Sequence, residues 1–236
     1  MRPNLRSFGA VALIVALGAG LLLLASGPGY RIGAWSLQTG FLLVRWAAYG
    51  GIAALALALV ALVRRHSTMY GFLALVVALV TVGIPLRFLR MARTAPPIHD
   101  ITTDTANPPA FEAIVPLRKD APNPLEYSQE VARQQREAYP DIKPLILEMP
   151  AAQVFDRAVQ AARDAGWDIV NVSAETWRIE ATDTTTFFGF KDDIVVRLTP
   201  IGSRTVVDVR SVSRLGRGDV GTNARRIREY LAALSG

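Results

Sequence analysis

The side chains best suited to acid–base chemistry in this chain are a histidine and the aspartate that follows it. His99 and Asp100 stand in a short segment of prolines, threonines and acids, where they would serve as the general acid–base pair of a hydrolase. Neighbours on an extended chain point to opposite sides, however, so such a pair rarely acts together. In the alternative interpretation, Asp100 bonds nearby backbone in a turn. Because no Ser-His-Asp triad can be assembled from the spacing, the sequence favours a domain without catalysis. An envelope enzyme that uses His99 and nearby carboxylates is the alternative.

Arginines form the second group of candidate residues, because a guanidinium fork matches a carboxylate or a phosphate. Arg178 and Arg210 fall on predicted strands, on a sheet face that also carries acidic side chains. Arg214 follows in a glycine-rich turn before the last helix, a setting that can hold an anion. Two interpretations stay open. These arginines bind a small anionic ligand together with His99 and Asp100, or they pair with carboxylates across strands, which stabilises a sheet by about 0.2–1 kcal/mol per pair.

Three phenylalanines gather around one glycine between two predicted strands. Phe187, Phe188 and Phe190 surround Gly189, which is more aromatic surface than such a loop usually needs to anchor itself. They either plug the open edge of the core, enter the membrane surface or line an apolar pocket. We expect at least one of them to be exposed or to line a pocket.

The histidine and cysteine counts restrict the cofactors that the chain could hold. Cysteine is absent and the only histidines are His66 and His99. These counts exclude disulfides, thiol catalysis and cysteine-based zinc sites, and they argue against a metal site built from several histidines of one chain. No nucleotide-binding fingerprint occurs. We therefore expect neither a metal nor another cofactor.

Charge divides the chain into two parts. The first 93 residues carry nine arginines and no aspartate or glutamate, whereas the remainder carries 17 basic and all 20 acidic side chains. The formal net charge of +6 therefore arises in the first part alone. Because those arginines flank apolar runs, they indicate a lipid bilayer as partner and not nucleic acid.

Three apolar runs in the first part predict transmembrane helices at residues 8–26, 41–63 and 69–86. Small residues recur at every fourth position, which lets helices approach closely within one bundle or between copies in a homo-oligomer. Arg45 is the one charge inside a predicted span, about one turn from its start, where it can reach the interface. Pro85 should kink or end the third helix.

The arginine count hardly decides which way the helices insert. Arg2 and Arg6 precede the first run, and the first helix usually keeps its positive flank inside. Three spans then place the remainder outside the cytoplasm. Arg87, Arg90 and Arg93 argue for the reverse. The first run is long for a signal peptide, which favours an uncleaved anchor.

The predicted organisation is a membrane module at residues 1–93, a proline-rich segment at 94–124 and a soluble domain at 125–236. Apolar residues in the proline-rich segment indicate that it packs along the domain. The domain should be α+β, an antiparallel sheet with helices on one face, because amphipathic helices flank a series of strand-like runs. Apolar residues alternate along 194–198 and along 207–209, which predicts two strands with one apolar face each. A four-residue turn at 200–203 between them would place Asp193 opposite Arg210.

Several segments of the second part together resemble one protein family. They are PPIHDITTD at 96–104, RIEAT at 178–182, GFKDD at 189–193, VDVRSVSR at 207–214 and GDVGTNARRI at 218–227. Residues 94–236 are similar, through these segments, to the bacterial domain-of-unknown-function fourteen-ninety-nine family. The resemblance implies an exported or membrane-attached α+β domain. That family has no settled activity, so the resemblance assigns no catalytic residues.

Together with this resemblance, the sequence predicts a membrane-anchored envelope protein of the bacterial inner membrane. Its soluble domain is expected to be periplasmic and to serve as a non-catalytic binding or accessory module. Its expected partners are an envelope protein or a small anionic ligand. The two alternatives are the hydrolase-like enzyme at His99 and a structural subunit of a membrane complex.

Overall fold

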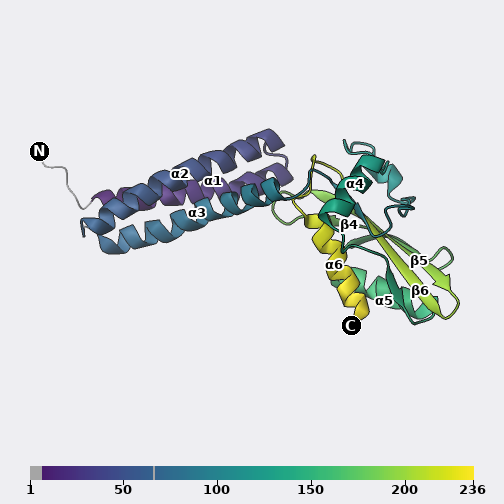
Figure 1. Cartoon of the computed structure of the whole chain (residues 1–236). Helices are drawn as coiled ribbons and strands as arrows, with labels where there is room; N and C mark the ends of the chain where they lie inside the picture. Colours follow the sequence, from purple (N-terminus) through teal and green to yellow (C-terminus); the bar gives the residue numbers. More distant parts are fainter. Residues whose placement is uncertain (1–6, 66) are drawn as a thin grey trace, which may run out of the picture. The chain divides into compact units, whose positions relative to one another are not determined.

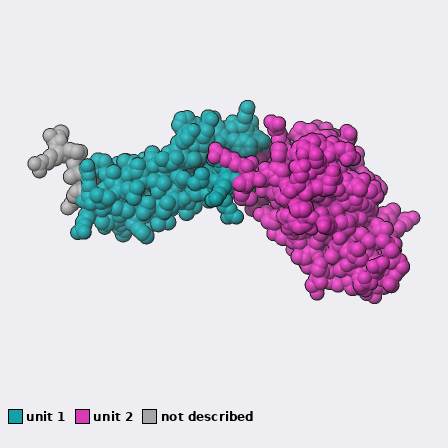
Figure 2. All heavy atoms as spheres, in the orientation of Figure 1, with its two compact units in different colours: residues 1–90, 187–189 teal, residues 91–186, 190–236 magenta. Residues whose placement is uncertain are grey.

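The computed structural model describes residues 7–65 and 67–236, and these fall into two compact units (Figures 1 and 2). Unit 1 extends to residue 90 and includes residues 187–189. Unit 2 contains residues 91–186 and 190–236.

Three helices build unit 1, and all three are long and apolar enough to cross a membrane. They are α1 (Ser7–Arg31), α2 (Leu37–Val63) and α3 (Thr68–Thr94). The side chain of Ser36 caps α2 by accepting the Thr39 N–H, so this helix begins four residues before the predicted span. The expectation that Pro85 could end α3 was wrong. The strong helix formers that follow it, such as Leu86 and Met91, carry the helix on to Thr94.

Small side chains hold the three helices together. Six alanines are completely buried in one cluster: Ala12, Ala16, Ala54, Ala58, Ala74 and Ala78. Leucines and valines that are partly buried pack around them. The small residues predicted from the sequence are therefore used for close packing inside this bundle.

Unit 2 is an antiparallel sheet of six strands with α-helices. Its elements are β1 (Asp100–Thr102), η1 (Val115–Arg118), α4 (Gln129–Ala138), β2 (Leu145–Leu147), α5 (Ala151–Asp164), β3 (Asp168–Ser173), β4 (Arg178–Thr184), β5 (Lys191–Ile201), β6 (Arg204–Ser213) and α6 (Thr222–Ser235). The strand order is β1-β6-β5-β4-β3, and β2 also pairs with β6. This arrangement confirms the predicted α+β class.

Helices α5 and α6 cover one face of the sheet and form the main core with it (Figure 1). Alternate residues of the strands, such as Ile194 and Val209, meet Val154 and Ala158 of α5 and Ile227 of α6. Because successive side chains of a strand point to opposite faces, polar residues stand between the apolar core residues along β5 and β6.

The register of the β5–β6 hairpin differs from the predicted one by two residues. Ile201 pairs with Arg204, so the turn has two residues and begins at Gly202 with φ +61°. Asp193 consequently lies opposite Val212, and the prediction that it lies opposite Arg210 was wrong. Because the shift is an even number, each apolar residue keeps its predicted face. Strand β5 continues to Pro200, beyond Arg197, its last residue that pairs with β4. Because β4 is not paired with β5 at Pro200, the missing N–H of the proline leaves no hydrogen bond between these two strands unmade.

Residues 103–128, which we call the strap, run from β1 to α4 across the sheet face opposite to α5 and α6. Phe111 and Ile114 of the strap are buried against Val195 of β5 and Val212 of β6. The strap thus forms a second, smaller core on the sheet face that carries the charged residues.

Candidate functional site

The first candidate ligand-binding arginine, Arg210, forms a buried ion pair with Asp100. The Arg210 Nε and Nη2 atoms donate to the two carboxylate oxygens of Asp100 at 3.0 and 2.7 Å. Arg210 also donates to the carbonyl oxygens of Pro109 and Leu125 in the strap. Only 3% of Arg210 and 2% of Asp100 is exposed. The guanidinium therefore forms these hydrogen bonds within the protein and joins β1, β6 and the strap.

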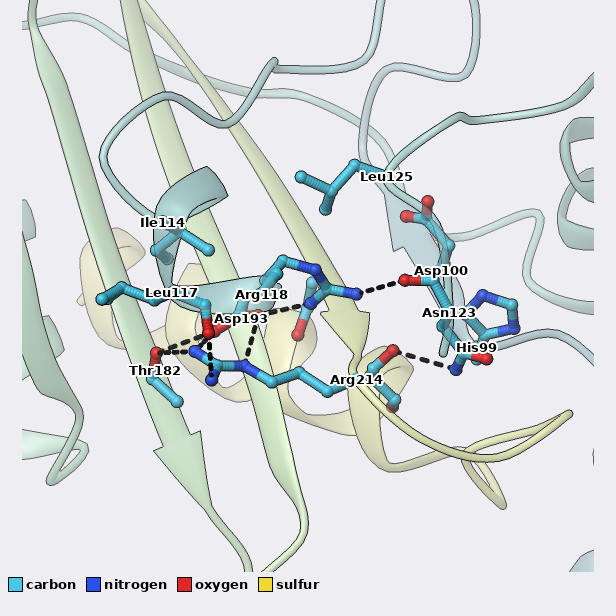
Figure 3. A network of polar contacts seen from close by, with 12 residues as sticks. His99, Asp100, Ile114, Leu117, Arg118, Asn123, Leu125, Thr182, Asp193 and Arg214 are labelled. Carbon is cyan, nitrogen blue, oxygen red and sulfur yellow. Dashed lines mark hydrogen bonds and ion pairs between the residues drawn. The ribbon is translucent and has the colours of Figure 1, made fainter. Parts of the chain in front are cut away.

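A second buried cluster surrounds Asp193, which has no exposed surface (Figure 3). Arg214 donates to both of its carboxylate oxygens, at 2.9 and 2.8 Å. The Thr182 hydroxyl donates to the same carboxylate at 2.7 Å, and Arg118 of the strap forms an ion pair with it. Arg118 also donates to the Asn123 carbonyl at 2.9 Å. Arg214, a candidate anion ligand in the sequence, thus pairs with an internal carboxylate.

Glu180 holds the turn of the strap in place. Its buried carboxylate accepts the backbone N–H groups of Glu112, Ala113 and Ile114 at 2.9, 3.1 and 2.9 Å. Arg178, the third candidate arginine, pairs with Glu112 at 2.9 Å and donates to the Ala110 carbonyl. Both strand residues therefore bind the strap. The three consecutive N–H groups hold the Glu180 carboxylate as they would hold a small anion.

The strap is fastened at its start as well. Arg197 of β5 donates to Asp104 at 3.2 Å and to Asp208 at 2.9 Å. Asp208 also accepts the hydroxyl of Thr103 at 3.2 Å. Charged side chains of β4, β5 and β6 thus form hydrogen bonds or ion pairs with residues along most of the strap.

The proposed acid–base pair does not come together. His99 is half-buried, and its carbonyl accepts the Ser213 N–H at 2.9 Å and the Asn223 side-chain amide at 3.0 Å. The side chains of His99 and Asp100 point in different directions (Figure 3). Burial raises the pKa of Asp100, while the hydrogen bonds and charge of Arg210 oppose that rise. A raised pKa suits a general acid, but both oxygens of this carboxylate are held by Arg210.

A further charged cluster lies on the helix-covered face and was missed in the sequence. Arg226 of α6 bonds Asp183 at 2.6 Å and Asp192 at 2.8 Å, and it also donates to Ser211 and Asn223. An arginine on the inner side of an amphipathic helix is the signal that could have identified it, because a buried guanidinium requires buried acids nearby. Asp219, just before α6, accepts the N–H groups of Gly221 and Asn223, and burial raises its pKa.

An open groove of about 560 Å³ lies between the outer sides of α5 and α6. The rings of Trp167 and Tyr230 stack at 4.8 Å along it. Charged residues of both signs line the groove: Arg157, Asp164, Asp183, Arg225, Arg226 and Glu229. Alanines at 161, 165 and 233 also line it, and their short side chains leave the space open.

The three phenylalanines do not share one environment. Phe187 is 40% exposed, whereas Phe188 and Phe190 are half-buried. Phe187 and Phe188 belong to unit 1, where the Phe188 ring centroid lies 5.2 Å from those of Phe41 and Phe187. Phe190 belongs to unit 2, and its N–H donates to the Thr185 hydroxyl at 2.8 Å.

A metal centre in this cysteine-free chain would need several histidine or carboxylate side chains close together. Within residues 7–65 and 67–236, no group of three or more histidine, aspartate or glutamate side chains is placed to hold a metal ion.

The comparison with protein families identifies the region that contains these clusters. Residues 100–234 match the family described as "Protein of unknown function (DUF1499)". The match begins at β1 and ends in α6, so it includes the strap, the sheet and both covering helices. None of the curated proteins compared with the chain matches it.

Proposed function

The chain belongs to the DUF1499 family, and we propose that its unit 2 is a non-catalytic binding module held at the cell envelope by the three membrane helices. The observation that carries this proposal is the groove between α5 and α6, whose charged lining residues include exposed ones.

The arginines on the strap side of the sheet support a structural role for that face. A ligand there would have to displace Asp100 from Arg210, or Asp193 from Arg214. Breaking a buried pair by removing one partner costs about 3–5 kcal/mol, because the other charge stays buried and uncompensated. Ligand binding by these arginines would meet a similar cost. We therefore assign binding to the opposite side of the unit.

The groove contains charged side chains that are exposed and only loosely paired. Arg225 and Glu229 approach only to 3.8 Å, with 60% and 70% of their side chains exposed. Arg157 donates to the Leu234 carbonyl at 2.9 Å and to the Met149 sulfur at 3.5 Å. With guanidinium and carboxylate groups on its walls, the groove fits a zwitterionic ligand or an envelope-protein segment with both charges better than a simple anion.

Photo-crosslinking in cells tests this proposal. A photoreactive amino acid replaces Gln160, Arg225 or Ala233 in the groove, each of which is exposed. Matched controls carry it at Glu130 or Arg133, which are exposed on α4. We expect a discrete crosslinked product from the groove positions alone. Equal products from both sets, or none from the groove, would contradict a binding role for it.

We also propose that unit 2 faces the periplasm. The support is the odd number of spans together with the positive flank of the first helix, although Arg2 and Arg6 lie outside the described residues. The arginines near the end of α3 oppose this orientation, and reporter fusions at the C-terminus measure which of the two effects dominates.

A further inference from the structure

Helices α2 and α3 pack in one antiparallel register. A methyl group placed on Gly71 of α3 would lie 3.4 Å from the Ala61 Cβ of α2. One placed on Gly51 of α2 would lie 3.4 Å from the Thr81 Cγ2 of α3. Each step toward the start of α2 therefore corresponds to one step toward the end of α3.

This register places two arginines at the same level of the bundle. Arg45 stands six residues before Gly51, and Arg87 stands six residues after Thr81. At the other end, Arg64 follows Ala61 by three residues, and Thr68 precedes Gly71 by three. Arg45 therefore lies level with Arg87, and Arg64 lies level with the start of α3.

The distance between these two levels matches the thickness of a bilayer. Arg45 and Arg64 are 19 residues apart, as are Thr68 and Arg87, and no charged residue stands between them on either helix. Nineteen helical residues rise about 28 Å, close to the roughly 30 Å of hydrocarbon in a bilayer. The charge-free stretch thus spans the hydrocarbon, and Arg45 marks its boundary.

Aromatic side chains on the same level support this boundary. Trp46 and Tyr49 are each 55% exposed on α2, and their ring centroids lie 5.8 Å apart. Phe88 is exposed beside Arg87 on α3. Tryptophan and tyrosine are enriched at the membrane–water interface. Both helices then continue past the boundary, to Leu37 and Thr94, by roughly 10–12 Å.

We propose that Arg45 and Arg87 form a collar that binds the phosphate of anionic phospholipids at this boundary. Both side chains are exposed, and Arg90 adds a third exposed arginine one turn further along α3. The first 93 residues contain no acidic side chain that could neutralise Arg45 or Arg87. Guanidinium groups bind phosphate with paired, charge-assisted hydrogen bonds, and the aromatic neighbours fit the headgroup region. The collar fixes how deeply the bundle sits in the membrane.

Lipid retention measured by native mass spectrometry tests the collar. The full chain is released from nanodiscs of mixed phosphatidylcholine and phosphatidylglycerol. We expect the wild type to retain phosphatidylglycerol above its bulk proportion, and the Arg45→Gln, Arg87→Gln double variant to retain only the bulk proportion. Arg93→Gln, an exposed arginine on the last turn of α3, is the matched control and should keep the enrichment. A double variant that retains as much phosphatidylglycerol as the wild type would overturn the proposal.

Depth measurements check the boundary without altering any arginine. Because the chain has no cysteine, a single spin label can be attached at Leu42→Cys or Ile52→Cys, both exposed on α2. The label at 42 should collide mainly with a water-soluble nickel complex, and the label at 52 mainly with oxygen dissolved in the lipid. If both labels reside equally deep in the hydrocarbon, Arg45 is not at the boundary and the collar is wrongly placed.

Discussion

Asp100 and Arg210 join β1 to β6 through two hydrogen bonds of 2.7 and 3.0 Å, in a place where both side chains are almost completely buried. The rings of Phe111 and Tyr127 lie 5.3 and 5.6 Å from the guanidinium carbon. This pair fixes the strap to the sheet, because Arg210 also bonds strap carbonyls at both ends of residues 109–125. Its importance lies less in net stability than in the cost of leaving either charge alone.

Replacing Asp100 by Asn should therefore be strongly destabilising. The buried Arg210 would lose its charged partner, and we expect the free energy of unfolding to fall by about 3–5 kcal/mol. Denaturant unfolding of the full chain in detergent, followed through tryptophan fluorescence, measures this. Glu130→Gln is the control, because it breaks an exposed pair with Arg133 and should cost less than about 1 kcal/mol. Similar losses for both variants would show that the buried pair is unimportant.

Two neighbouring arginines of α6 should respond very differently to the same substitution. Arg226 is buried and bonds Asp183 and Asp192, so Arg226→Gln leaves two acids without their cation and should cost about 3–5 kcal/mol. Arg225 is exposed in the groove, and Arg225→Gln should change stability by less than about 0.5 kcal/mol. The same unfolding experiment compares them. A large loss for Arg225→Gln would mean that the groove is part of the core and not a free surface.

The stability contributed by Asp219 should depend on pH. Burial raises its pKa in the folded chain above the ordinary value near 3.8. The folded state then holds the proton more tightly than the unfolded state, so this contribution is complete below pH 3.8 and is lost as the pH rises through the raised pKa.

Comparing the wild type with Asp219→Asn isolates that effect. The stability of the wild type relative to the variant should decrease as the pH rises across this window, since asparagine does not titrate. Unfolding curves recorded at several pH values give the difference. A difference that is constant, or that grows with pH, would mean that the pKa is not raised.

The orientation of the membrane helices can be read from fusions at the C-terminus. We expect alkaline phosphatase joined there to be active, because this enzyme works only outside the cytoplasm. A fluorescent protein that matures only in the cytoplasm should remain dark in the matching fusion. The opposite pattern would place unit 2 in the cytoplasm and would show that Arg87, Arg90 and Arg93 dominate the orientation.

Local sequence patterns predicted the helices and strands well, because each depends on neighbours a few residues apart. Alternation along 194–198 and 207–209 identified β5, β6 and their inner faces. The register between them was missed by two residues, since alternation is unchanged by an even shift and only the turn at Gly202 distinguishes the two pairings.

The clusters under the strap could not be predicted in the same way. Arg118 and Asp193 are 75 residues apart, and Asp100 and Arg210 are 110 apart. The residue types were recognised as candidate ligand groups, but their partners lie on a proline-rich segment with little periodicity. The three residues of β1 are also too few to produce a strand pattern. Charge alone therefore indicated a polar face, but it did not indicate whether that face binds a ligand or the chain's own strap.

Hydrogen exchange at the strap tests most directly whether the arginines under it are structural. The N–H groups of Glu112, Ala113 and Ile114 donate to Glu180, so they exchange only when the strap leaves the sheet. For the full chain in detergent micelles, we predict that these amides exchange as slowly as those of Val195 and Val196 in the middle of β5. Rapid exchange at 112–114 with a protected β5 would show that the strap opens by itself. In that case, the arginines beneath it would be accessible to a ligand, and their purely structural role would be contradicted.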